Sequence, residues 1–260
     1  MGSEAGVGPL LRQWRERRRM SQLELALAAD SSTRHLSFVE NGRSKPSQSM
    51  VLKLAEHLDV PVRDRNALLL AAGYAPLYSQ LPLSSPEMTT VRVGIERLLD
   101  AYAPFPALVF DGTYEVVAAN SAVQRIFLDG VSPAVTANGI NLLRVGLHPD
   151  GLARRVVDFP AWREHLLERV ERSLTARPSP TLQAVYDEVT AYPIVDGLPG
   201  TGPGPTVAVA LPFQLAVDDR VLSFITTVAT FNSPLDITVS ELAIETFLPA
   251  DQSTVDYLRD

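Results

Sequence analysis

Hydrogen-bonding side chains cluster between residues 32 and 37, where Ser32, Thr33, Arg34, His35 and Ser37 stand almost without interruption. Hydroxyl, guanidinium and imidazole groups can donate and accept hydrogen bonds at the base edges in the major groove of DNA. Arg34 could make the bidentate contact with guanine that discriminates between bases by roughly 1–3 kcal/mol. The run can therefore read a DNA sequence if a helix presents it to the groove.

Two short helices would position this run. Ser21 is a favourable N-cap, and Glu24 three residues later completes a capping box for the first helix. We expect that helix to bury three apolar residues, Leu23, Ala26 and Leu27. Residues 30–32 favour caps and turns, so they end the first helix and start the second. The second helix ends at Gly42, a C′ residue, and points two apolar residues inward, Leu36 and Val39.

This pair of helices resembles the helix-turn-helix of the XRE family, which includes the lambdoid phage repressors and Cro. The matching motifs are Ser21-Gln22-x-x-Leu25-Ala26 and Glu40-Asn41-Gly42-x-x-x-Pro46. The resemblance implies an all-α, five-helix, lambda-repressor-like head over residues 1–75 that binds double-stranded DNA and in which Arg15 pairs with Glu40. It also implies contacts to the phosphate backbone from four polar residues around the reading helix, Gln22, Asn41, Arg43 and Lys45.

One residue departs from the family pattern. Asp30 occupies the turn position that is usually glycine. Asp tolerates the left-handed backbone conformation better than most residues, so the turn can still form.

The charge of the chain is unevenly distributed. The formal net charge is −7, which alone argues against a nucleic-acid-binding protein. Residues 1–75, however, carry 11 Lys and Arg against 8 Asp and Glu, whereas residues 76–260 carry 12 against 22. This asymmetry favours a basic head that meets DNA and an acidic body that phosphates repel.

Residues 76–86 contain prolines and no hydrophobic period, which is typical of a linker. Ser85, Pro86 and Glu87 then supply an N-cap, an N1 proline and a first-turn acid for a helix that ends near residue 102. One face of this helix is apolar, and it would pack against the second domain or against a second copy of the chain. The second domain would span residues 87–260, with this helix as its connection to the head.

The second domain shows β-strand patterns at both ends. A hairpin is predicted around the turn at Asp111-Gly112, followed by a short helix after Asn120, as at the start of a PAS-type sensor domain. Helical patterns fill residues 139–192. Strict alternation then predicts a strand over residues 207–217, a return strand over 221–231 and a third over 242–248. The fold class expected is α+β, PAS-like, with an antiparallel sheet.

The second domain also resembles the MmyB-like ligand-binding domain that follows an XRE head in many bacterial regulators. The residues that carry the match include Asn141-Leu-Leu-Arg144, Leu147-His148-Pro149-Asp150-Gly151, and Glu245-x-Phe247-x-Pro249-Ala250-Asp251. With the head, the resemblance covers almost the whole chain in order. It implies that the domain holds a small molecule.

The alternating strands fit either a filled core or the walls of a cavity, because alternation shows burial and not emptiness. The resemblance favours a cavity for a small, largely apolar ligand such as a fatty acid. The apolar contacts expected come from five residues, Phe110, Leu211, Phe213, Phe224 and Val228. The polar end of the ligand would meet one of three cationic or polarisable side chains, Arg144, His148 or Arg163.

Residues for catalysis or metal binding are not evident. The four histidines lack metal-ligand spacing, and the chain has no cysteine. No nucleophile motif or paired-acid arrangement is found, so we expect no catalytic residue, no metal and no cofactor. The sequence shows neither a membrane-length apolar run nor a signal peptide, which favours a cytoplasmic protein that binds no membrane.

The sequence therefore predicts a dimeric bacterial transcription regulator whose second domain senses a small ligand and modulates operator binding. Two alternatives remain open at this stage. The second domain could be an enzyme tethered to a DNA-binding head, or it could be a module that binds a protein partner.

Overall fold

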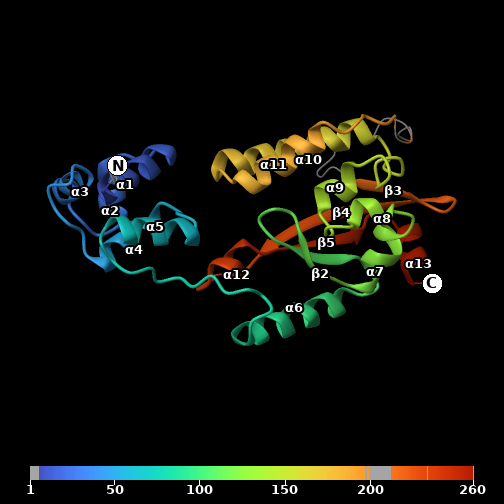
Figure 1. Ribbon diagram of the computed structural model, residues 1–260, viewed down its shortest axis with the longest axis horizontal. Helices are drawn as coiled ribbons and strands as arrows, with labels where there is room; N and C mark the ends of the chain where they lie inside the picture. Colours follow the sequence, from blue (N-terminus) through green and yellow to red (C-terminus); the bar gives the residue numbers. More distant parts are fainter. Residues whose placement is uncertain (1–5, 197, 199–211, 233, 260) are drawn as a thin grey trace. The chain divides into compact units, whose positions relative to one another are not determined.

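The computed structural model describes residues 6–196, 198, 212–232 and 234–259. The chain divides into two compact units. The first contains the described residues of Met1–Pro82 and of Asn232–Ser240, and the second contains those of Leu83–Phe231 and Glu241–Asp260. Figure 1 traces the chain through both units.

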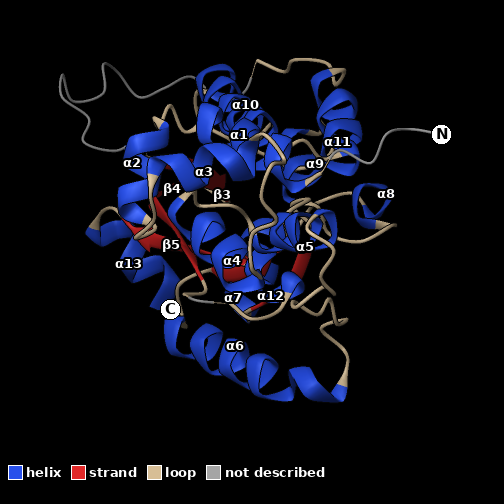
Figure 2. Cartoon of the chain, turned by 90° about the vertical axis from the view of Figure 1, so that its left-hand side faces the viewer, coloured by secondary structure: helices blue, strands red, loops and turns tan. Residues whose placement is uncertain are grey.

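The first unit is built from the five predicted helices, α1 (Val7–Arg17), α2 (Gln22–Ala28), α3 (Thr33–Glu40), α4 (Gln48–His57) and α5 (Val62–Ala71). Serine hydroxyls cap three of them, because Ser21, Ser32 and Ser47 each accept a hydrogen bond from a backbone N–H of the first turn. The capping box of Ser21 and Glu24 is complete. Figure 2 shows these helices packed around one another, and their shared core includes Leu11, Leu36 and Leu54.

The predicted inward face of α2 is wrong in part. Leu25 and Ala26 are buried, but Leu23 and Leu27 are 56% and 70% exposed. A helix turns by about 100° per residue, so the face that buries residues 25, 26 and 29 carries residues 23 and 27 outward. Asp30 adopts the left-handed conformation expected at the turn, with φ of 51°.

The segment after α5 is held in place by side chains of the same unit. The Asn66 amide oxygen accepts hydrogen bonds from the backbone N–H groups of Leu77 and Tyr78, at 3.0 and 3.1 Å. Its amide nitrogen donates to the Tyr78 carbonyl at 2.7 Å. The first half of the predicted linker is therefore fixed against α5 by hydrogen bonds.

A second clasp involves Asp236, at the start of α12 (Ile237–Glu241). Its buried carboxylate accepts hydrogen bonds from the Ser79 hydroxyl at 2.6 Å and the Leu81 backbone N–H at 3.1 Å. The Thr238 hydroxyl donates to the Leu81 carbonyl at 2.7 Å. The segment between β4 and β5 thus belongs, by its contacts, to the first unit.

The second unit contains a five-stranded antiparallel sheet in the order β2-β1-β5-β4-β3. Its strands are β1 (Ala107–Phe110), β2 (Val116–Ala119), β3 (Phe213–Val217), β4 (Arg220–Thr230) and β5 (Ala243–Pro249). Residues 207–211 of the first strand predicted in the last third, among them Leu211, lie outside the described residues. The predicted fold class, a five-helix head with an α+β unit that holds an antiparallel sheet, is confirmed.

Helices cover both faces of this sheet. A 3₁₀ turn (Pro86–Met88) leads into α6 (Thr89–Tyr102), whose Ile95 and Leu99 pack on Val109 of β1 and Ile244 of β5. Figure 1 shows α6 on one side of the sheet and α9, α10 and α11 on the other. The apolar face of α6 is therefore covered by its own domain. A dimer of this chain would have to form through another surface.

The opposite face is covered by the remaining helical elements, which are α7 (Ser121–Val123), a π-helical turn (Gln124–Leu128), α8 (Pro133–Thr136), α9 (Leu142–Leu147), α10 (Phe159–Ala176) and α11 (Pro180–Thr190). The final helix, α13 (Gln252–Arg259), packs on β4 and β5. The fully buried Asn141 caps α9 and donates to the Thr113 carbonyl at 3.0 Å, which joins α9 to the β1–β2 hairpin.

Candidate functional site

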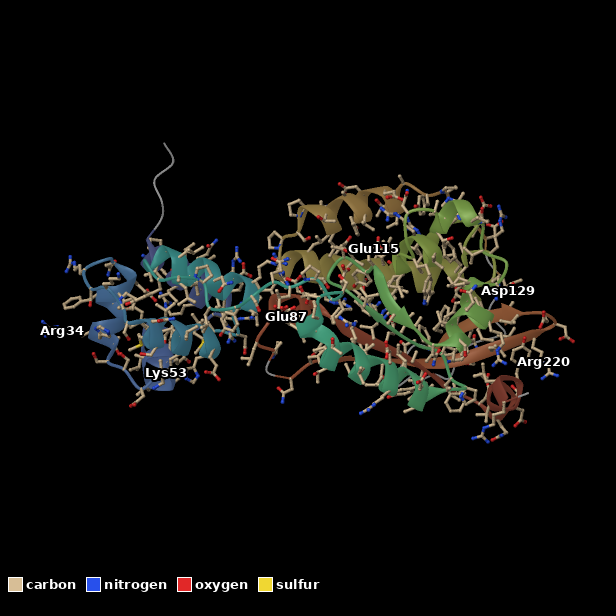
Figure 3. All side chains as sticks on the ribbon, turned by 60° about the horizontal axis from the view of Figure 1, so that its bottom comes forward. Arg34, Lys53, Glu87, Glu115, Asp129 and Arg220 are labelled. Carbon is tan, nitrogen blue, oxygen red and sulfur yellow. The ribbon has the colours of Figure 1, made fainter. Side chains whose placement is uncertain are left out.

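Helix α3 presents the predicted DNA-reading side chains at its first turns. Ser32 accepts a hydrogen bond from the His35 backbone N–H at 3.1 Å, so its hydroxyl serves as the N-cap. Thr33 and Arg34 are exposed, and His35 and Ser37 are half-buried. Figure 3 shows Arg34 at the outer surface of the head. Its guanidinium carbon lies 5.4 Å from the centre of the Phe38 ring, an arrangement that restrains the long side chain.

A close backbone approach fixes α3 against α1. A Cβ atom at Gly8 of α1 would lie 2.4 Å from the Val39 carbonyl oxygen and 2.6 Å from that of Glu40. Only glycine leaves room for two helices at this separation. The last turn of the reading helix therefore rests directly on α1.

A buried ion pair reinforces this packing. The Arg15 Nε and Nη2 atoms donate to the two carboxylate oxygens of Glu40 at 2.7 and 2.9 Å, and the pairing expected from the family resemblance is confirmed. Hydrogen bonding to Glu40 raises the pKa of Arg15. The Gln22 amide also donates to Glu40 at 2.8 Å. Gln22 thus links α2 to α3, and only part of its hydrogen-bonding capacity is left for DNA.

The loop after α3 carries the other predicted phosphate ligands. Asn41 donates to the Ser37 carbonyl at 2.8 Å, and Arg43 is exposed. The Lys45 ammonium lies 4.9 Å from the centre of the Tyr74 ring, and the Tyr74 hydroxyl donates to the Pro46 carbonyl at 3.0 Å. Both cations can therefore reach solvent from a loop of defined shape.

A cavity of about 120 Å³ lies in the second unit, between the sheet and the helices α9 and α10. Aromatic rings form much of its wall, contributed by Phe127, Trp162, Phe213 and Phe247. Aliphatic side chains from β1, β2 and α9 complete the apolar lining, among them Leu108, Val116 and Val145. Four polar side chains also face it, namely His165, Arg169, Thr226 and Glu245. The cavity is thus apolar with a few polar groups, as small-molecule sites usually are.

The charged part of this lining is an ion pair that is only partly satisfied. Arg169 Nη1 lies 3.4 Å from Glu245 Oε1. Glu245 is 6% exposed, and burial raises the pKa of its carboxyl group, although Arg169 opposes the shift. The Nε atom of Arg169 is buried and has no hydrogen-bond partner among the described residues. A buried N–H without a partner is costly, so this donor is a prime position for a ligand atom.

A second recess of about 410 Å³ is lined by Arg144, His148, Glu188 and Tyr192, with residues around α8. Here the charges already satisfy one another. Arg144 donates to Glu188 at 2.9 Å and to Glu115 at 3.2 Å. The hydrogen bond to Arg144 lowers the pKa of Glu188, and burial together with Glu188 raises the pKa of Tyr192 to about 12. Because polar and charged side chains form most of its lining, this recess is less suited than the cavity to an apolar ligand.

The ligand-site residues predicted from the sequence are distributed over several places. Phe213 lines the cavity. Phe224 packs behind it, 6.3 Å from the Phe213 ring and 6.2 Å from the Phe247 ring. Phe110 stacks on Tyr114 at 5.2 Å, and Val228 is 48% exposed.

The three residues predicted for the polar end of the ligand do not line the cavity. Arg144 and His148 line the second recess, and Arg163 donates to the Thr190 carbonyl at 3.1 Å. Arg169 and Glu245 are the charged residues that do line the cavity, and they were missed. A glutamate within the apolar strand Ala243–Pro249 was the available signal, because a charge is rarely buried without a partner or a function.

Within the part of the chain that the structure describes, no group of three His, Cys, Asp or Glu side chains could hold a metal ion. The described helices likewise include none that is long and apolar enough to cross a membrane.

Comparison with known proteins identifies both units. Residues 91–260 match the family described as the MmyB-like transcription regulator ligand binding domain, and residues 11–64 match a helix-turn-helix family. The chain belongs to the MmyB-like transcription regulators. This MmyB-like chain is therefore a DNA-binding transcription regulator with a ligand-binding domain.

Two curated relatives of this MmyB-like regulator come from Mycobacterium bovis and Mycobacterium tuberculosis, and both are named as uncharacterized HTH-type transcriptional regulators. Each is 26% identical over 206 residues, which cover 73% of this chain and 78% of the relative. The crystal structure of the clp gene regulator ClgR from Corynebacterium glutamicum also matches, with 24% identity and a TM-score of 0.24. That match covers 39% of this chain and 94% of ClgR.

Proposed function

We propose that this regulator binds its operator as a homodimer and that a small, largely apolar ligand in the 120 Å³ cavity changes its affinity for DNA. The observation that carries the ligand part of the proposal is the cavity itself, which is lined by aromatic rings and by an arginine with an unpartnered buried N–H. The homodimer is proposed because helix-turn-helix proteins usually bind two half-sites as dimers. As a protein that acts on DNA, the regulator would work in the cytoplasm.

On the DNA side, the exposed turn of α3 would read bases and the flanking residues would fix the register. Arg34 is the candidate for a bidentate guanine contact, and Ser32, Thr33, His35 and Ser37 would supply the remaining base contacts. Arg43 and Lys45 would contact phosphates together with Gln22 and Asn41. The buried Arg15–Glu40 pair supports this assignment because it fixes the C-terminal end of α3 against α1. Gln22 joins the same carboxylate to α2.

On the ligand side, size narrows the choice of ligand. An engineered cavity of about 150 Å³ in another protein accommodates benzene. A cavity of about 120 Å³ therefore suits a compact body, such as a short-chain fatty acid or a single aromatic ring. A long-chain fatty acid would have to extend out of the cavity or require the helices that cover the sheet to move apart.

A path from the cavity to the head supports modulation of DNA binding. Thr226 of β4 and Glu245 of β5 face the cavity, and the segment between these two strands carries Asp236. Asp236 holds Ser79 and Leu81 in the first unit, and Asn66 holds Leu77 and Tyr78 against α5. A ligand that shifts β4 and β5 would thus act on a segment that is hydrogen-bonded to the head. The ligand can change DNA binding only if it binds more tightly to one arrangement of the head than to another.

Native mass spectrometry of the purified full-length chain tests the proposal. We expect a dimer that carries a co-purified small molecule, or that takes up a compact apolar probe such as benzyl alcohol. A monomer that binds none of a panel of compact apolar probes would overturn both parts of the proposal. The Asp236→Asn variant should keep ligand binding but reduce the effect of the ligand on DNA affinity.

A further inference from the structure

The polar part of the cavity contains a specific pair of groups. Arg169 of α10 and Glu245 of β5 lie in contact with each other, and both line the cavity. The Glu245 side chain is buried, whereas 31% of the Arg169 side chain is exposed. A structural pair would be expected to satisfy its buried atoms, because a buried polar atom without a partner is costly. Here the contact is long, at 3.4 Å, and Arg169 Nε is buried with no partner among the described residues.

We propose that Arg169 and Glu245 form the head-group subsite of the cavity and select a carboxylic acid, which binds together with one proton shared between the ligand and Glu245. This inference rests on the proposed function, because it names the ligand chemistry of the same cavity. Arg169 would donate from Nε to one ligand oxygen. The other ligand oxygen would face Glu245.

The number of protons that bind with the ligand follows from the charges in the site. Arg169 carries one positive charge, and Glu245 and a ligand carboxylate would carry two negative charges in a site where Glu245 is 6% exposed. Two carboxylates in contact cannot both ionise in such a site, so one proton stays between them. With that proton the site is neutral overall. The raised pKa of Glu245 agrees with this arrangement, because the free protein already favours the protonated form more than an exposed glutamate does.

The other residues that line the cavity do not supply an alternative neutralising charge. Helix α10 contributes Arg169 and the exposed His165. Strand β4 contributes the uncharged Thr226, and β1 and β2 contribute the apolar Leu108 and Val116. The ring centre of Tyr114 lies 5.7 Å from the guanidinium carbon of Arg169. His165 is the remaining titratable group on the cavity wall, and it needs its own control.

Isothermal titration calorimetry on the purified protein, in whatever oligomeric state it has, tests the proposal. The probes are hexanoate and benzoate, with hexan-1-ol and benzyl alcohol as uncharged counterparts. At a pH above the pKa of free Glu245, the acids should bind with uptake of about one proton, read from titrations in buffers of different ionisation enthalpy. Their affinity should fall tenfold per pH unit in that range, whereas the alcohols should show neither effect. This measurement requires no variant.

Variants then assign the effect to the two residues. Arg169→Gln should weaken binding of the acids by roughly 10- to 100-fold, the range expected for a hydrogen bond to a charged group, and should leave the alcohols within about threefold. Glu245→Gln should abolish the proton uptake while the acids still bind. Arg172→Gln is the matched control, because Arg172 lies on the same helix in an exposed pair with Glu168. His165→Gln should preserve the proton uptake.

The outcomes distinguish failure of the ligand site from failure of the head-group subsite. If neither acids nor alcohols bind, the cavity is not a ligand site and the proposed function fails. If alcohols bind as tightly as acids and Arg169→Gln changes neither, the cavity is a ligand site but the head-group subsite is wrong. Acid binding without proton uptake in the wild-type chain would likewise overturn the subsite.

Discussion

Replacing Gly8 by alanine should destabilise the DNA-binding head. The added Cβ would lie 2.4 Å from the Val39 carbonyl oxygen and 2.6 Å from that of Glu40, and both are backbone atoms that cannot rotate away. Helix α1 or α3 must therefore shift. Overpacking of this kind costs about 1–3 kcal/mol, and a backbone clash belongs at the upper end of that range.

Two further contributions set the net effect. Alanine has a higher helix propensity than glycine by about 1 kcal/mol, which offsets part of the cost. The shift also strains the Arg15–Glu40 pair, whose two hydrogen bonds of 2.7 and 2.9 Å join the same helices. We expect a net loss of about 2 kcal/mol in the unfolding free energy of the head. For a domain of this size that corresponds to a decrease of roughly 8–16 °C in its melting temperature.

The matched control is Gly6→Ala, because a Cβ atom at Gly6 meets nothing within 4 Å. Thermal unfolding followed by circular dichroism, with operator binding by fluorescence anisotropy, measures both variants in the full-length chain. Gly6 is the N-cap of α1, where glycine is preferred to alanine, so Gly6→Ala should lower the melting temperature less than Gly8→Ala and should bind the operator as the wild type does. If Gly8→Ala melts at the same temperature as Gly6→Ala, the close packing of α1 on α3 does not support the head as described.

Three other outcomes are expected. Arg34→Ala should lose operator affinity but retain affinity for random DNA, whereas Lys45→Ala should weaken binding to both. If both variants lose the same affinity on every sequence, the division into base and phosphate contacts is wrong. Burial raises the pKa of Glu245, so the folded protein retains a proton that the unfolded chain releases. Stability should therefore decrease as pH rises from the ordinary pKa of glutamate through the raised one. Glu245→Gln should remove this contribution to the pH dependence of the melting temperature. Sedimentation equilibrium should give a dimer that binds two half-sites about 34 Å apart, and a monomer with full affinity for one half-site would contradict this.

The structure of the head was predicted well from local sequence patterns. The capping box at Ser21 and the left-handed turn at Asp30 follow from short-range backbone chemistry, and both are present. The exposed positions of Leu23 and Leu27 were not predicted, because three leucines at alternate positions leave the inward face of a short helix ambiguous. The attachment of Asn66 to Leu77 and Tyr78 was also missed, since a proline-containing segment without a period gives no sign of what holds it.

The candidate ligand site was harder to predict from sequence. Strand alternation identified Phe213 as inward-facing, but it could not distinguish a cavity wall from the packed ring of Phe224 behind it. Arg169 and Glu245 are 76 residues apart in the chain and meet only because α10 crosses the face of the sheet that carries β5. Such a pair is a property of the tertiary fold. Arg144 was an equally plausible cation by sequence, and its partners Glu115 and Glu188 become evident only in three dimensions.

The most direct test of ligand control is the operator affinity of one preparation of the full-length chain in two states. The protein is stripped of bound molecules by unfolding and refolding, and it is then titrated against operator DNA at fixed salt with and without saturating hexanoate. Salt is held constant because phosphate contacts make affinity strongly dependent on it. Arg169→Gln serves as the control whose response should shift to higher acid concentrations.

Coupling of typical strength predicts that hexanoate changes the operator affinity of the wild-type chain by about 5- to 150-fold, in either direction. Because Arg169→Gln should weaken acid binding by roughly 10- to 100-fold, the variant should need a correspondingly higher hexanoate concentration for the same change in operator affinity. If the two wild-type titrations superimpose although calorimetry shows the cavity occupied, the second unit does not regulate the head through this ligand site.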